Sequence, residues 1–324
     1  MPHQKNEWYI IVNPRAGSGK TMSEWVPAEN RLIELGVPHN TVYTTHKHHA
    51  NELAATAARL GYRRILAVGG DGSLHEVFNG IVRWCFDSGT DPEEFYVAVV
   101  PIGSGNDWIK TFAVPDNAKE VVSLLAENSF GQQDIIGIKS EGNKITYMAN
   151  IAGIGFDSHV CERVNRQKER GMRSKRIYLN ALLHTIRWFR AINLEVIADG
   201  TSVFSGKCYS IALGNGKYSG GRFRQTVLAD PCDGIADCLI VPKVPMMTLL
   251  KELPRLVKGN ANESENVYYV QARNIRIIPL DSRSADLLEV DGEIEGKMPL
   301  EVTVTGRHIN VLVGKSYKKI TGES

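Results

Sequence analysis

The stretch from Arg64 to Gly80 constrains the fold more strongly than any other part of the chain. It opens with the short apolar run Ile-Leu-Ala-Val, is interrupted by Gly69–Gly72 (GGDG), and continues with apolar residues at helical spacing. This order predicts a buried parallel strand, a glycine turn and then a helix. Glycines at such a junction let the backbone pass close to a bound phosphate, and the first amides of the helix point toward it.

Asp71 is the unusual residue of this turn. A carboxylate beside an anion pocket is unfavourable unless a metal ion, a proton or a transferred group requires it. Asp71 is therefore a candidate magnesium ligand or general base. The alternative is that it only caps the helix that follows, because aspartate is a preferred capping residue.

Four motifs in the chain resemble those of one enzyme family. The stretch Gly69–Gly80 (GGDGSLHEVFNG) resembles the nucleotide-binding signature of the diacylglycerol kinase and sphingosine kinase superfamily of lipid kinases. Three further stretches follow the order of that family: Asn13–Lys20 (NPRAGSGK), Pro101–Asp107 (PIGSGND) and Val290–Glu293 (VDGE). The resemblance implies transfer of the γ-phosphate of ATP to a lipid hydroxyl, with Mg²⁺ as cofactor.

The residue pattern that predicts secondary structure changes near residue 134. Before it, strands alternate with helices and carry glycine turns at their ends, which predicts an α/β domain with a parallel sheet and a ligand at the carboxyl ends of the strands. After it, β-branched alternation separated by Gly and Asn turns predicts an antiparallel β-rich sandwich. We therefore expect an α/β domain at 1–133 and a β-rich domain at 134–313. The resemblance implies that the first is an NAD kinase-like nucleotide domain and that the second binds the lipid substrate. The resemblance implies that 314–324 return to the first domain.

Composition limits the classes of binding partner and the cellular compartment that we expect for this chain. A length of 324 residues allows two domains, and a net charge of +2 does not indicate a nucleic-acid partner. Five cysteines without a CxxC pair predict reduced, buried thiols in a cytoplasmic protein and no zinc site. No signal peptide and no run of about 20 apolar residues is recognised. A lipid substrate would then be met at the membrane surface.

The resemblance implies which residues hold the nucleotide. They lie in the turns after the predicted strands: Asn13, Arg15, Thr44, Thr45, Gly69, Gly70, Gly72, Ser73, Glu76, Gly103, Ser104, Gly105 and Asn106. The family usually has threonine where Ser73 and Ser104 stand, and serine keeps the hydroxyl. Gly17–Thr21 is not a P-loop, because Pro14 occupies the place of the required first glycine.

The acidic motif residues are assigned to catalysis and to metal binding. Asp71 and Asp107 are expected near one triphosphate, which favours a magnesium ion between them and the phosphates. The resemblance implies that Asp291 and Glu293 face the nucleotide and the acceptor, and either Asp71 or Asp291 could be the general base. We rank Asp71 slightly ahead. An acidic loop at residues 230–237 resembles a structural magnesium site of bacterial members, with Asp233 as the expected ligand.

Two further segments allow competing interpretations. Residues 46–49 (HKHH) could form a metal tract, but the neighbouring lysine and the lack of a nearby carboxylate favour a plain loop before a helix. Residues 163–190 hold nine Lys or Arg against one Glu, with Trp188 and Phe189 near the end. This segment is either an interfacial helix that contacts anionic lipid or a solvated helix packed on the sandwich.

The sequence does not identify the lipid that accepts the phosphate. Diacylglycerol or a related glycerolipid is favoured because the chain resembles the compact bacterial form, and a sphingoid base or ceramide is the alternative. Arg222 stands where the family usually has a glycine, which puts the lipid preference in doubt. An NAD kinase and a catalytically silent lipid-binding protein are the other hypotheses. A cytoplasmic protein in peripheral contact with the inner membrane surface is expected, and the sequence leaves its oligomeric state open, a homodimer included.

Overall fold

A computed structural model describes residues 4–103, 105–170, 180–181, 184–185, 188–221 and 223–317. Ser104 and Arg222 therefore lie outside the described residues, as does much of the basic segment 163–190. The chain divides into two compact units. Unit 1 comprises Met1–Ile135 and Gly306–Ser324, and unit 2 comprises Ile136–Thr305.

Unit 1 is built on a parallel sheet. Its strand order is β2-β1-β3-β4-β17, and every described neighbouring pair in it is parallel. The strands are β1 (Trp8–Val12), β2 (His39–Tyr43), β3 (Arg64–Gly69), β4 (Tyr96–Pro101) and the end of β17 (Leu300–Leu312). Apart from their first residues, β3 and β4 are buried along their whole length. Such continuous apolar runs are typical of strands covered on both faces.

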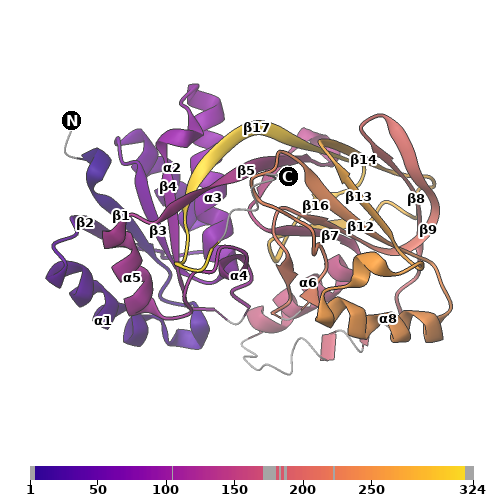
Figure 1. Cartoon of the computed structure of the whole chain (residues 1–324), viewed down its shortest axis with the longest axis horizontal. Helices are drawn as coiled ribbons and strands as arrows, with labels where there is room; N and C mark the ends of the chain where they lie inside the picture. The colour runs from indigo at the N-terminus through magenta and orange to yellow at the C-terminus, as the bar shows by residue number, and fades with distance from the viewer. Residues whose placement is uncertain are drawn as a thin grey trace. The chain divides into compact units, whose positions relative to one another are not determined.

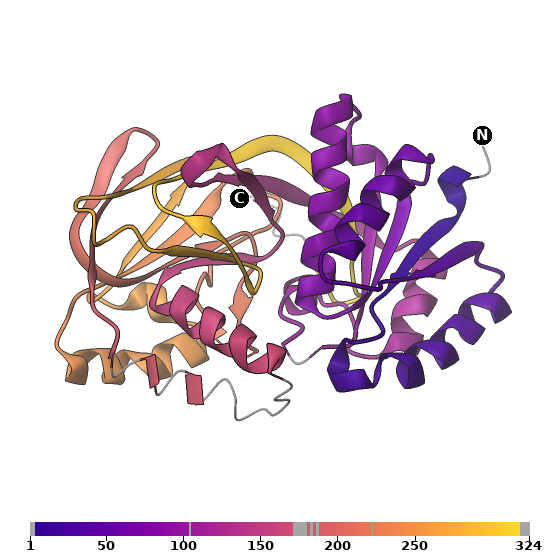
Figure 2. The ribbon, with the colours of Figure 1, turned by 180° about the vertical axis from the view of Figure 1, so that it is seen from behind.

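Helices cover both faces of this sheet. They are α1 (Thr21–Glu34), α2 (His49–Arg59), α3 (Asp71–Ser88), α4 (Trp108–Thr111) and α5 (Ala118–Glu127). The helix α1 packs against α5 and α2 packs against α3, and the two pairs lie on opposite faces (Figure 1, Figure 2). The contact between α2 and α3 depends on Gly80, because a Cβ there would overlap the backbone carbonyl of Asn51.

Unit 2 is an antiparallel β structure. Its main path runs β16-β15-β7-β9-β8-β14-β17, and β12 joins β9 to β13. The strands are β5 (Phe130–Lys139, which begins in unit 1), β6 (Ile145–Met148), β7 (Ile151–Gly155), β8 (Ile192–Ala198), β9 (Thr201–Gly214), β10 (Tyr218–Ser219), β11 (Phe223–Arg224), β12 (Ala236–Pro242), β13 (Tyr268–Ala272), β14 (Asn274–Pro279), β15 (Leu287–Val290) and β16 (Glu293–Lys297). Alternating apolar residues of these strands form one buried core.

Unit 2 contains the helices α6 (Phe156–Glu169) and α8 (Met246–Lys258). The described residues also form five short 3-10 helices: Gln4–Asn6, Gly17–Gly19, Pro92–Glu94, Glu141–Asn143 and Ala261–Glu263. The predicted combination of a parallel α/β domain and an antiparallel β-rich domain is confirmed. Among the described residues, none of the helices has the length and apolarity needed to cross a membrane.

The cysteines follow the sequence prediction only in part. All five are free thiols, and three of them, Cys85, Cys208 and Cys238, are buried. Burial raises the pKa of the Cys85 and Cys208 thiols to about 12, which makes them unreactive. Cys161 and Cys232 are half-exposed, so the expectation that all five are buried is wrong.

Candidate active site

Three glycine turns meet at the carboxyl edge of the parallel sheet in unit 1. They follow β1, β3 and β4, which are neighbours in that sheet. A Cβ at Gly17 would lie 2.6 Å from the side chain of Ile102, and a Cβ at Gly103 would lie 2.7 Å from Gly70 Cα. Only glycine allows the turns to come this close, and the result is a compact cluster of backbone groups.

The first two turns are joined by a side-chain hydrogen bond. Asn13 Nδ2 donates to Ser73 Oγ at 3.2 Å, and Asn13 Oδ1 accepts from the amide of Arg15 at 3.0 Å. The Arg15 side chain is exposed at the same edge. Asn13, Arg15 and Ser73 therefore lie together, at the place where the sequence predicted nucleotide contacts.

Asp71 joins the second turn to the third. Its Oδ1 accepts from the amides of Asp107 at 2.9 Å and Trp108 at 3.4 Å. The helix α3 itself has Gly70 as its N-cap and no side-chain capping bond. Asp71 therefore does not cap its own helix, which was the alternative interpretation. It instead binds the amides where the short helix α4 begins.

Two carboxylates converge at Gly105. A Cβ at this glycine would lie 3.0 Å from Asp71 Oδ2 and 3.3 Å from Asp107 Oδ2. Asp107 is buried, and its Oδ1 lies 2.6 Å from Lys110 Nζ. Carboxylate oxygens are the ligands that Mg²⁺ prefers, so the donor set at Gly105 fits that ion.

Asn106 holds the third turn in a left-handed conformation. Its φ is 48°, and its Nδ2 donates to the Pro101 carbonyl at 3.2 Å and to Asp116 Oδ1 at 3.1 Å. Its Oδ1 is buried and has no hydrogen-bond partner within the described part of the chain. A buried polar atom without a partner is costly, so this oxygen is suited to a ligand or a bound water.

Glu76 makes a contact that the sequence did not indicate. Its carboxylate accepts from the amides of His48 and Ala50, each at 3.1 Å, and so caps the start of α2. The preceding loop contains Thr44 and Thr45 and leaves the carboxyl end of β2. Glu76 thus fixes the loop that contains the two threonines.

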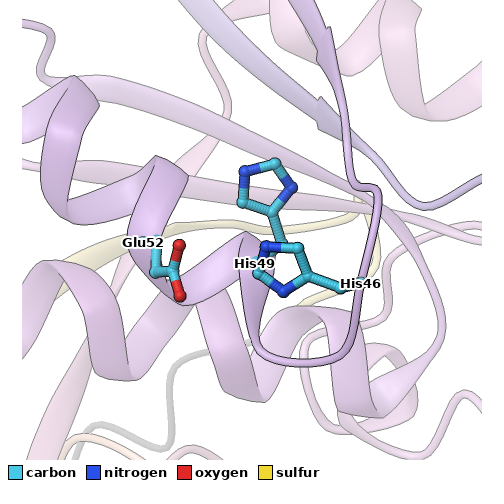
Figure 3. Close-up of side chains that lie close together, drawn as sticks. All are labelled: His46, His49 and Glu52. Atoms are coloured by element: carbon cyan, nitrogen blue, oxygen red, sulfur yellow. The ribbon is translucent and has the colours of Figure 1, made fainter.

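The histidine loop also differs from expectation. His46, His49 and Glu52 lie together, with one ligand atom of each within 4.8 Å of the others (Figure 3). The prediction that no carboxylate lies near this loop is wrong, because the first turn of α2 places Glu52 beside His49.

In unit 2, Asp291 lies in the turn between β15 and β16, and Glu293 is the first residue of β16. Asp291 is buried with a φ of 52°, and its two carboxylate oxygens accept from the amides of residues 149–151 at 2.8 to 3.2 Å. The carbonyl of Gly292 accepts from Asn165 Nδ2 at 2.8 Å. The turn is therefore held rigidly from both sides.

The acidic loop of unit 2 contains a buried carboxylate that the sequence did not single out. Burial raises the pKa of Asp237 to about 6, although the Tyr269 hydroxyl donates to its Oδ1 at 2.5 Å. The predicted metal ligand Asp233 accepts from the Ile235 amide at 3.1 Å, as in an ordinary Asx turn. Asp237 is the last residue of this loop and the second residue of β12, and it is a second acidic residue to consider there.

Asp157 was also missed as a candidate site residue. It lies in the first turn of α6, and burial raises the pKa of its carboxyl. Ser210 Oγ at 2.8 Å and Gln225 Nε2 at 3.0 Å both donate to its Oδ2. The signal in the sequence was its place two residues after the glycine-rich strand β7, which matches the place of Asp71 two residues after β3.

A parallel sheet with glycine turns and convergent carboxylates at its carboxyl edge is typical of α/β proteins that bind nucleotide phosphates. Residues 7–138 match the model of the diacylglycerol kinase catalytic domain, and residues 150–313 match that of the YegS C-terminal NAD kinase beta sandwich-like domain. The chain belongs to this family and is a lipid kinase.

Named relatives agree with this assignment, and a solved structure shares the fold. A diacylglycerol kinase of Mycobacterium tuberculosis is 24% identical over 311 residues, which cover 96% of each chain. One of Staphylococcus aureus is 26% identical over 302 residues, 93% of this chain and 90% of that protein. A crystal structure of a diacylglycerol kinase from Bacillus anthracis has a TM-score of 0.71 at 18% identity, over 96% of this chain and 97% of that one.

Proposed function

We propose that this enzyme transfers the γ-phosphoryl group of ATP to the hydroxyl of diacylglycerol or a related glycerolipid. The observation that carries the proposal is the convergence of Asp71 and Asp107 on Gly105, among three glycine turns that are in close contact with one another. The glycerolipid is supported by the names of the relatives, which are called diacylglycerol kinases. A sphingoid base or ceramide is the alternative acceptor.

In this proposal the nucleotide binds to unit 1 and the lipid to unit 2. Asn13, Arg15 and the amides of the three glycine turns bind the phosphates, and Asn106 offers its buried oxygen to the bound nucleotide. Asp107 would hold Mg²⁺ beside Asp71, and the ion when bound would neutralise phosphate charge. Asp233 would hold a second, structural magnesium.

The lipid hydroxyl loses a proton during transfer, so one carboxylate must accept it within about 3 Å. We assign this role to Asp71. Asp71 lies among the glycine turns of the nucleotide unit, whereas both oxygens of Asp291 already accept from the amides of residues 149–151. Asp291 and Glu293 then act as positioning groups in unit 2.

Contact with anionic lipid at the cytoplasmic face of a membrane is proposed for the basic segment 163–190. Residues 171–179, 182–183 and 186–187 of it lie outside the described residues. Among those described, Trp188 is 68% exposed, and exposed aromatic side chains beside basic residues suit the headgroup region. A homodimer is compatible with this arrangement.

The test is transfer of radiolabelled γ-phosphate from ATP to a panel of lipids in mixed micelles, with and without Mg²⁺. Asp71→Asn is compared with Asp87→Asn, an exposed aspartate on the same helix. We expect the wild-type enzyme to label diacylglycerol. The rate of labelling should fall by at least about a hundredfold in Asp71→Asn and should be retained in Asp87→Asn. Label in a sphingoid lipid alone would contradict the acceptor, label in NAD would favour an NAD kinase, and no product would favour a silent protein.

A further inference from the structure

We propose that His46, His49 and Glu52 bind a divalent transition-metal ion of the zinc class at the start of α2. Figure 3 shows the two imidazole rings one above the other, with the Glu52 carboxylate beside them. Two imidazole nitrogens and one carboxylate oxygen are a typical set of protein ligands for Zn²⁺, which completes its tetrahedron with water. No motif used for the kinase reaction includes these three residues.

The three ligand atoms lie close together but not yet at the distances that a bound metal ion requires. The three ligand atoms lie within 4.8 Å of one another, whereas a tetrahedral zinc ion with bonds of about 2.0–2.1 Å needs them about 3.4 Å apart. His46 and Glu52 are exposed and free to rotate, and the His46 ring must turn out of its stack with His49 before both imidazoles can face one ion. Among the described residues, the Glu52 carboxylate makes no hydrogen bond or ion pair that such a rotation would break.

His46 is already oriented as a ligand. Its Nδ1 lies 2.9 Å from the carbonyl of Lys47, so Nδ1 must be the protonated nitrogen that donates to it. The remaining nitrogen, Nε2, then carries the lone pair that a metal requires. A backbone carbonyl that fixes the tautomer in this way is a usual partner of metal-binding histidines.

His49 can take two tautomers, and a metal selects one of them. Its Nδ1 lies 3.0 Å from the Thr45 amide nitrogen and 3.2 Å from Thr45 Oγ1. When Nδ1 accepts from the amide, the proton is on Nε2 and that nitrogen cannot bind a metal. When the proton moves to Nδ1, it is donated to Thr45 Oγ1 and Nε2 becomes a ligand. Metal binding therefore releases the Thr45 amide from the ring.

The backbone around the site is held in place by Glu76. Its carboxylate binds the amides of His48 and Ala50 between the proposed ligands, at 3.1 Å each. The rings of His46 and His49 stack with centroids 4.4 Å apart, so the two side chains already lie together. Lys47 and the positive end of the α2 dipole oppose a cation, so the binding should be weak and reversible.

The experiment is titration of the full chain with Zn²⁺, followed by calorimetry, and with Co²⁺, followed by its visible absorption. His46→Gln, His49→Gln and Glu52→Gln are each expected to weaken binding by at least about tenfold. His48→Gln is the matched control, because His48 lies between the ligands in the sequence but outside the cluster. Undetectable binding to the wild type, or equal loss in His48→Gln, would overturn the proposal.

A second readout tests the tautomer change without using activity. In amide NMR spectra, the Thr45 resonance is expected to shift on Zn²⁺ addition to the wild type and to stay in place in His49→Gln. If the proposed function is also correct, Thr45 belongs to the nucleotide loop, and zinc then couples to nucleotide binding. Zinc binding without a shift of Thr45 would contradict the tautomer change, and it leaves the kinase assignment unaffected.

Discussion

Substitution of Glu76 gives the sharpest test of how the nucleotide loop is held. In Glu76→Ala, the amides of His48 and Ala50 lose the carboxylate that accepts their hydrogen bonds. A hydrogen bond to a charged group contributes about 1.5–3 kcal/mol, and water can reach this partly exposed site. We therefore expect a total cost of about 2–3 kcal/mol, close to twice a typical lost cap of about 1 kcal/mol. Glu76→Gln keeps one acceptor oxygen and is expected to cost about half as much.

The assay should report on α2 directly. Because the chain has two units, global unfolding is not guaranteed to be two-state, and hydrogen exchange of the α2 amides measures the local free energy of opening. Glu24→Gln, an exposed glutamate in the first turn of α1, is the control and should leave α2 unchanged. If Glu76→Ala leaves α2 exchange unchanged but lowers ATP affinity by more than about tenfold, the carboxylate contacts the nucleotide and our interpretation is refuted.

Three further predictions concern stability. Gly80→Ala should cost about 1–3 kcal/mol in urea unfolding, because its Cβ would overlap the Asn51 carbonyl between α2 and α3. The hydrogen bond to Asp286 raises the pKa of His159. The pair therefore stabilises the folded state fully below about pH 6.5, and this stabilisation is lost as the pH rises through the raised pKa. Asp286→Asn should lower the melting temperature at about pH 5.5 far more than at about pH 9. Folding raises the pKa of Asp237 from 3.8 to about 6. The contribution of this carboxyl to folding is therefore largest below about pH 4, and up to about 3 kcal/mol of stability is lost as the pH rises to about 7. If the stability of Asp237→Asn fell equally over the same pH range, Asp237 would be excluded as the cause.

The glycine turns could be predicted because their signals are local. A strand, a glycine turn and a helix follow one another within Arg64–Gly80, and parallel strands place their carboxyl ends on one edge. The change to β-branched alternation likewise predicted the antiparallel unit. These features need only neighbouring residues, and for that reason pattern and composition were enough to find them.

The partners of the acidic residues could not be predicted from local pattern. Glu76 binds amides that lie 28 and 26 residues earlier in the chain, and Asp291 binds amides about 140 residues earlier. Only the packing of α2 against α3, and of β15 against β7, brings these groups together. The pairing of His49 with Glu52 is different, since residues three apart share one face of a helix and the sequence already contained that spacing.

Long-range amide contacts change how the motif carboxylates must be tested. Asp71, Glu76 and Asp291 each accept from two or more backbone amides of a distant segment, so each one also positions a loop. An alanine variant removes the chemical group and the loop anchor together, and a loss of turnover would not tell them apart. An asparagine or glutamine variant keeps one acceptor oxygen but cannot take up a proton. A residue that serves only as an anchor should then retain much of its activity in the amide variant and lose it in the alanine variant, whereas a general base should lose activity equally in both.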